Sequence, residues 1–406
     1  MEIRKMGFCG TGRWLRVMLW FLCLLELAGC ISPITLNRAV GAYDEAITSA
    51  LSKQLLMNIA RAHYQQPIHF SGVSNVAATF DFRFNAGGTP ALGGLAGSVL
   101  MPIFGGTVAE NPTISIVPIE GEAFTKRLLT PFDQSKLTLL LRQRFDVDLL
   151  LRLMAQEVYI KQASQQIAYR NAPADSSGYE MFRRVALHLS AIQDQNQLYA
   201  EPMTLENTWT VPAEAITAEG FQGLEKEFMV LYNKEGKTYT LRKQARAPTL
   251  ITNYDPDTLP VEERKRLHEE TFDWIESDIA FDIRPGYPGG EWPLRGSFRL
   301  RSFHQILSFL GRSIDDEPEY YVEKDPRTPP IKGNENPTAT MQLLVSNSLF
   351  SESDLSVYSN GNCYAVNTEG PHARWNRDAF QMLYLLFQMT ITEVPRQGVP
   401  SITIAK

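Results

Sequence analysis

Apolar residues recur at intervals of three and four along several stretches of this chain, which is the period of an amphipathic helix. The spacing predicts helices over Tyr43–His63, over residues 121–155, over Tyr179–Gln195, over Phe303–Leu310 and over about Arg377–Thr390, with a charged surface helix over Val261–Trp274. Asp146-Val147-Asp148 predicts a break inside the second stretch, with Asp148 as an N-cap. Ser302 and Gln305 predict a capping box, and Gly311 predicts the end of the same helix.

Strict alternation of apolar and polar residues over Val76–Ala86 predicts a strand with one apolar face. Thr113–Pro118 is a second extended stretch, and the residues between, Gly87–Gly106, are glycine-rich and almost uncharged. The simplest prediction is a long hairpin over residues 76–118 with an apolar tip. That tip is either a plain loop or a segment that inserts into a membrane or a partner. The poor alternation of Glu110, Pro112 and Ile114 weakens the second alternative.

Shorter strands are predicted in the second half of the chain. They are Phe228–Tyr232 and Lys237–Leu241 around a four-residue loop, Ile279–Ile283, Gln342–Ser346, Ser356–Val366 around Asn360-Gly361, and Ser401–Ile404. Helices and hairpins in this mixed order favour an α+β fold with antiparallel strand pairs over a doubly wound sheet.

One apolar run is of a different kind. Val17–Leu25 follows Arg4, Lys5, Arg13 and Arg16, and it is shorter than the roughly 20 residues that a membrane-spanning helix needs. Such a run behind positive charge is typical of a secretory signal peptide. The alternatives are an ordinary secretory signal without lipidation and a membrane-spanning anchor.

Leu27-Ala28-Gly29-Cys30 directly follows this run and resembles the lipobox of bacterial lipoproteins. The resemblance implies cleavage after residue 29, a diacylglycerol on the Cys30 sulfur and an acyl chain, such as palmitate, on the new amino terminus. More than one chain is what stable anchoring requires. Because Ile31 is not Asp, the resemblance further implies the outer membrane, with the protein facing the periplasm.

The composition fits a globular protein and argues against nucleic acid as a partner. The chain has 406 residues, of which 44% are hydrophobic and 21% charged, and its net charge is −6. Nucleic-acid binding favours a basic surface. Of the four cysteines, Cys9 and Cys23 precede the cleavage point and Cys30 takes the lipid, so Cys363 is left alone, and we expect it to be buried in its strand.

No catalytic, cofactor or metal motif stands out. The six histidines include no pair with the i, i+4 spacing of a zinc helix, and Gly-x-Ser-x-Gly and Ser-x-x-Lys are both absent. No Lys-Ser or Lys-Thr follows the glycines of 87–106, which excludes a phosphate loop there. The close pairs Asp146/Asp148 and Asp255/Asp257 are better explained as residues that begin a helix or form a turn than as a metal site. We therefore predict no cofactor and no enzyme activity.

Tyr287 and Trp292 are the candidate ligand contacts. They lie in a loop rich in Pro and Gly, over Arg284–Gly296, where aromatic rings could stack on a sugar or a peptide. The alternative is that these rings close over an edge of the core.

These patterns divide the chain into consecutive segments: a signal peptide over residues 1–29, a tether over 30–42, a helical region over 43–200 with the hairpin 76–118 inserted, an α+β region over 201–323, a linker or long loop over 324–340, and a C-terminal α+β segment over 341–406.

Three patches of the chain, Gln54–Tyr64 with Pro67 and Phe70, Leu300–Ser302 with the following helix, and Arg377–Phe387 with Pro400–Ile404, resemble a group of uncharacterised proteobacterial outer-membrane lipoproteins. The resemblance implies location and a shared fold, and no activity. We accordingly expect a structural or assembly component of a cell-envelope complex, anchored in the bilayer through Cys30, with an envelope protein or a second copy as partner. A periplasmic glycan- or peptide-binding module and an envelope hydrolase with a dispersed site are the alternatives.

Overall fold

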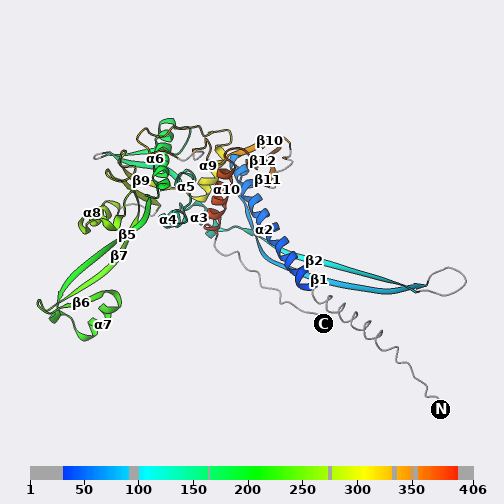
Figure 1. The fold of residues 1–406 in the computed structure, drawn as a ribbon, viewed down its shortest axis with the longest axis horizontal. Helices are drawn as coiled ribbons and strands as arrows, with labels where there is room; N and C mark the ends of the chain where they lie inside the picture. Colours follow the sequence, from blue (N-terminus) through cyan, green and yellow to red (C-terminus); the bar gives the residue numbers. More distant parts are fainter. Residues whose placement is uncertain are drawn as a thin grey trace, which may run out of the picture. The chain divides into compact units, whose positions relative to one another are not determined.

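The computed structural model describes residues 31–90, 100–162, 165–272, 277–331, 336–348, 350 and 355–391 (Figure 1). The chain divides into two compact units, Met1–Gln54 and Leu55–Lys406. The fold is α+β with mostly antiparallel strands, as predicted. The signal peptide, Cys30, residues 91–99 of the predicted hairpin tip and the predicted strand Ser401–Ile404 lie outside the described residues, whereas residues 87–90 and 100–106 of that tip extend the paired strands.

The first described helix, α2, spans Ile31–His63. It ends where predicted but begins about twelve residues earlier, so residues 31–42, which we expected to be a tether, are helical. Gln65 takes a positive φ of 55° after it, and Pro67 prevents its continuation. Its last turns belong to the second unit, where Leu55, Leu56 and Ile59 are fully buried.

Strands β1 (Phe70–Pro90) and β2 (Leu100–Ile119) pair antiparallel in a sheet of their own. The ladder starts at Phe70 opposite Ile119, and residues 91–99 lie outside the described part. Phe70 is fully buried and stacks on Phe387 with ring centroids 4.3 Å apart. The glycine-rich hairpin as a functional unit stays a prediction.

Three short helices follow: α3 (Glu122–Leu129), α4 (Gln134–Arg142) and α5 (Val147–Met154). The break that the sequence predicts at residues 146–148 is present, but the N-cap is Asp146, which accepts a hydrogen bond from Leu149 N. The prediction of Asp148 as the cap was wrong. Asp148 lies inside α5 and is buried against Arg183, which explains why it does not cap.

The main sheet has seven strands, ordered β4-β3-β9-β8-β7-β5, with β6 paired to the outer part of β7. Its strands are β3 (Ala155–Gln162), β4 (Gln165–Arg170), β5 (Tyr199–Pro212), β6 (Met229–Asn233), β7 (Thr238–Thr252), β8 (Asp278–Ile283) and β9 (Leu294–Leu300). Within it only β7 and β8 run parallel. The β6–β7 pair confirms the predicted hairpin around residues 233–236.

Helix α6 (Ser176–Asp194) packs on this sheet, where the rings of Phe182 and Phe298 meet edge to face at 6.1 Å. Strands β3 and β9 approach so closely that a Cβ on Gly296 would lie 1.8 Å from the Tyr159 carbonyl oxygen. Because β3 lies in the predicted segment 43–200 and β9 in 201–323, one sheet crosses the predicted boundary between them.

Helices α7 (Ala218–Glu227) and α8 (Val261–Phe272) and the short 3₁₀ turns Ala213–Ala215 and Pro256–Thr258 complete the middle of the chain. Helix α9 (Phe303–Arg312) begins at the predicted capping box of Ser302 and Gln305. We predicted that this helix ends at Gly311, and that prediction was wrong. The helix runs through Arg312 because Gly311 packs against α2, where a Cβ would lie 2.6 Å from His63 N.

The C-terminal strands β10 (Leu343–Ser346), β12 (Asn362–Val366) and β11 (Ser356–Ser359) form a three-stranded antiparallel sheet. Asn360 and Gly361 both have positive φ, 48° and 84°, which confirms the predicted two-residue turn. Helix α10 (Ala373–Gln388) begins four residues earlier than predicted. The ring centroids of Phe387 on α10 and Phe303 on α9 are 5.6 Å apart, and both side chains belong to the main hydrophobic core.

Candidate functional site

The most concentrated charge in the described part of the chain is buried. Arg152 on α5 donates to Glu319 Oε1 at 3.1 Å, to Thr340 Oγ1 at 3.0 Å and to the Thr338 carbonyl at 2.8 Å. Arg183 on α6 pairs with Asp148. All four charged side chains are at most 1% exposed.

Each charge in this cluster has an opposite partner. Burial alone would raise the pKa of Glu319, but the Arg152 charge and the hydrogen bonds from Thr340 lower it below its ordinary value. A buried charge is tolerated when it is paired and hydrogen-bonded in this way. The cluster fixes residues 336–340 and Glu319 to α5 and α6, and its saturated partners leave no group free for proton transfer.

Arg301 is buried, and no carboxylate among the described residues forms an ion pair with it. Its guanidinium donates to the carbonyl oxygens of Arg152, Leu153 and Asn171 at 2.8–3.2 Å. Burial lowers its pKa to about 9. Arg301 therefore ties the end of α5 to the end of β4 through backbone carbonyls.

The structure places the two candidate ligand contacts differently. Trp292 is 6% exposed, with the Arg327 guanidinium 4.8 Å from its ring and His188 at its edge. Tyr287 is 43% exposed and lies 5.4 Å from Tyr254. Arg327 covers the Trp292 ring, so Tyr287 offers the more accessible ring of the two.

The single cysteine in the described residues, Cys363, is buried, which confirms that prediction. Asp255 caps the turn that follows it, as its spacing predicted, by accepting a hydrogen bond from Asp257 N at 3.0 Å. Cys30, the predicted lipidation site, lies outside the described residues.

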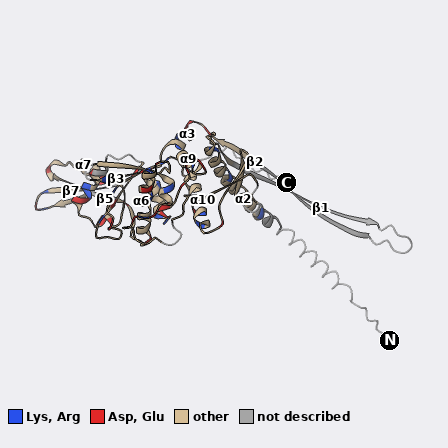
Figure 2. Cartoon of the chain, turned by 90° about the horizontal axis from the view of Figure 1, so that it is seen from above, with Lys and Arg blue, Asp and Glu red and all other residues tan. Residues whose placement is uncertain are grey.

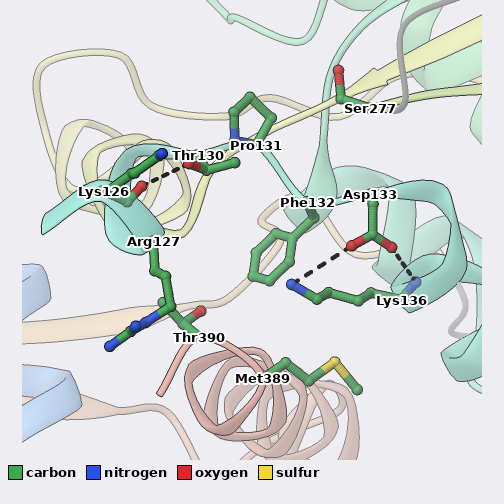
Figure 3. Close-up of a pocket in the computed structure, with 10 residues that line it drawn as sticks. All are labelled: Lys126, Arg127, Thr130, Pro131, Phe132, Asp133, Lys136, Ser277, Met389 and Thr390. Carbon is green, nitrogen blue, oxygen red and sulfur yellow. Dashed lines mark hydrogen bonds and ion pairs between the residues drawn. The ribbon is translucent and has the colours of Figure 1, made fainter. Parts of the chain in front are cut away.

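A cavity of about 380 Å³ opens beside α3, α4 and the end of α10 (Figure 3). Phe132 and Met389 line it together with the cations Lys126, Arg127 and Lys136. Lys136 pairs with Asp133 at 3.8 Å, and the Arg127 Nε is buried without a hydrogen-bond partner among the described residues. The cavity is mildly cationic, and no nucleophile and base are aligned in it.

A second cavity, of about 470 Å³, lies between the end of α2 and α9. His63, His304 and Asp316 are among its lining residues. Sequence reasoning missed this grouping, because His63 and His304 are far apart in the chain and only the packing of α2 on α9 brings them to one wall.

The edge strand β6 of the main sheet carries three exposed apolar side chains. Met229 is 65% exposed, Leu231 43% and Tyr232 51%. Among the described strands β6 pairs only with β7, so its second edge is unpaired. Acidic and basic residues are interspersed elsewhere along the described elements (Figure 2), so apolar exposure distinguishes this strand more than charge does.

Comparison with family models, with curated proteins and with solved structures found no match for this chain. Within the described residues, no helix combines the length and the apolar character needed to cross a bilayer. The functional argument therefore rests on the residues of this chain.

Proposed function

We propose that this protein is a lipid-anchored, non-catalytic component of a cell-envelope complex, held in the outer membrane through an acylated Cys30 and facing the periplasm. The observation that carries the proposal is the unpaired, apolar edge of β6. The anchor itself is supported by the lipobox and the basic, apolar run before it.

An exposed strand edge is a template for pairing with another chain, and proteins normally protect it with charges, proline or a covering element. The β6 sequence, Met229-Val230-Leu231-Tyr232-Asn233, contains neither a charge nor a proline. Its exposed side chains add apolar area to the backbone hydrogen bonds that a partner strand would gain. An envelope protein or a second copy of the chain is the partner that this edge fits.

The predicted hairpin 76–118 is a second contact region in this proposal. A two-stranded sheet is marginal in water without a third strand or a packed helix. In the described residues the β1–β2 sheet has two strands. We propose that a partner or the bilayer covers it, with the glycine-rich stretch Gly87–Gly106 at the contact.

Site-specific photo-crosslinking in cells tests the proposal. A photo-reactive residue in place of Leu231 should give a discrete crosslinked species that contains an envelope protein or a second copy. The same residue in place of Tyr321, which is 62% exposed but lies in a loop, is the matched control and should give none. Equal crosslinking at both positions, or none at either, would contradict the proposal.

Deleting Gly87–Gly106 tests the hairpin separately. The assembled complex should be lost, while the purified variant keeps the thermal transition of the intact protein. An unchanged complex would remove the hairpin from the proposal and leave the β6 edge as its basis.

The second candidate, a periplasmic glycan- or peptide-binding module, is favoured only by the exposure of Tyr287. Titration of glycans and peptides while the tryptophan fluorescence is followed distinguishes it, with Tyr287→Ala as the control. A saturable change lost in that variant would support this candidate.

A further inference from the structure

The end of α2 and the residues after α9 meet at a fixed contact. Gly311 packs so closely on α2 that a Cβ there would lie 2.9 Å from the Ala62 carbonyl carbon. This contact holds His63, the last residue of α2, beside Asp315 and Asp316. One ring nitrogen of His63 and one carboxylate oxygen from each aspartate all lie within 4.8 Å of one another.

The Nδ1 atom of His63 faces two oxygen atoms. It lies 3.3 Å from Asp315 Oδ1 and 3.2 Å from the Gly311 carbonyl oxygen. A single N–H can serve two acceptors only by sharing its proton between them, at the cost of geometry in each hydrogen bond. A cation among these atoms would satisfy the nitrogen lone pair and the oxygens together.

The separation between the His63 and Asp315 ligand atoms suits a small divalent ion. Zinc binds imidazole nitrogen and carboxylate oxygen at roughly 2.0–2.2 Å, which puts two ligands of a tetrahedral site roughly 3.3 Å apart. The observed separation of Nδ1 and Asp315 Oδ1 is 3.3 Å. Imidazole together with carboxylate favours zinc and its first-row neighbours over calcium or magnesium, which prefer oxygen ligands alone.

His63 supplies an observation independent of the two acidic residues. Its side chain is only 10% exposed, and it lines the 470 Å³ cavity. The cavity is also lined by Asp316 and His304, which leaves room for a fourth ligand or water. The nearby cation Arg312 pairs with Glu317 at 3.3 Å, so part of its charge is neutralised.

We propose that His63, Asp315 and Asp316 bind a zinc ion that joins the end of α2 to the segment after α9. This site is separate from the β6 edge and does not depend on the proposed function.

Calorimetric titration of the purified, detergent-solubilised full chain, without an added affinity tag, tests the proposal with zinc chloride. The intact protein should bind one equivalent of zinc, with calcium chloride giving no saturable heat. Asp315→Asn, Asp316→Asn and His63→Gln should each weaken binding by at least about tenfold. Asp378→Asn is the matched control because Asp378 is a half-exposed aspartate on α10, and it should bind as the intact protein does.

Asp315 is 65% exposed, so its substitution leaves the packing of α2 on α9 in place even if His63→Gln fails to fold. Absence of saturable zinc binding by the intact protein would overturn the proposal and leave a shared hydrogen bond at Nδ1. Loss of binding in the aspartate variants with full retention in His63→Gln would also overturn it, because an acidic patch alone would then account for the binding.

Discussion

Asp146 and His188 are buried titratable side chains whose effects on stability oppose each other as the pH changes. Burial, with a smaller contribution from Asp148, raises the pKa of Asp146 to about 6. Burial lowers the pKa of His188 to about 4. The His188 Nε2 donates to the Gly289 carbonyl and its Nδ1 accepts from Thr328, so the ring is held neutral.

The sign of each contribution follows from which state binds the extra proton. Between pH 4 and 6 the folded state holds the Asp146 proton more tightly, so this residue makes stability fall as the pH rises. Between pH 4 and 6.5 the unfolded state holds the His188 proton more tightly, so His188 makes stability rise over the same window.

We therefore expect Asp146→Asn to make stability rise more steeply with pH. Asn keeps the N-cap acceptor and removes the falling contribution. The free energy of unfolding of the variant minus that of the intact protein should increase by roughly 1–3 kcal/mol between pH 4 and pH 6.5. Urea denaturation at several pH values measures it, and a difference that stays constant with pH would contradict the assignment.

The buried ion cluster gives a larger effect at the residue scale. Glu319→Gln removes one of two carboxylates from a cluster with two buried arginines, and leaves Asp148 to face both Arg152 and Arg183, which costs roughly 3–5 kcal/mol. Asp378→Asn, which breaks an ion pair with the 92% exposed Arg374, should change stability by about 0.5 kcal/mol or less. The urea midpoint of each variant measures the contrast, and equal midpoints would show that the cluster is not stabilised by its charges.

At the scale of elements, the β6 edge should tolerate charge without unfolding. Leu231→Lys places a lysine on an exposed position of an edge strand, where natural proteins use this residue to prevent pairing. The thermal midpoint should change little, while crosslinking of neighbours in cells should fall. Thr240→Lys is the control, because Thr240 lies opposite Leu231 on β7, away from the free edge. Equal loss in both variants would point to a general charge effect.

Elements specified by local residues were predictable from the sequence. The capping box of Ser302 and Gln305 and the turn at Asn360-Gly361 require only neighbours in the chain, and both are present. Helix ends that depend on contacts with residues far away in the sequence were not predictable. Asp148 fails to cap α5 because Arg183 binds it, and Gly311 fails to end α9 because α2 packs against it.

The same distinction applies to the candidate sites. The β6 hairpin was predictable from two short strands around a four-residue loop, but the exposure of its edge depends on where the sheet stops. The contact between His63 and Gly311 of α9 joins positions 248 residues apart, and the contact of Arg152 with Thr340 joins positions 188 apart. No local pattern reports such pairings, so the sequence contained no signal for either cluster.

At the scale of the whole molecule, the proposed acylation of Cys30 would set the location of the protein. Cys30→Ser should release the protein from the membrane fraction and abolish incorporation of labelled palmitate, since the thiol is the atom that takes the lipid. Cys363→Ser is the matched control because that thiol is buried, and it should fractionate as the intact protein does. A Cys30→Ser protein that stays with the outer membrane would contradict lipid anchoring.

The central strands of the main sheet are drawn from distant parts of the chain, and this sets the order of events after synthesis. Arg299 on β9 reaches Glu157 on β3 across 142 residues. A ribosome delivers β3 long before β9, and pairings between remote segments close slowly. The emerging polypeptide therefore pairs β3 with β4 early but leaves its other edge without β9 until residue 300 has been made. In the proposed export, this delay keeps the sheet incomplete, which is the state that passage through a narrow translocation channel requires.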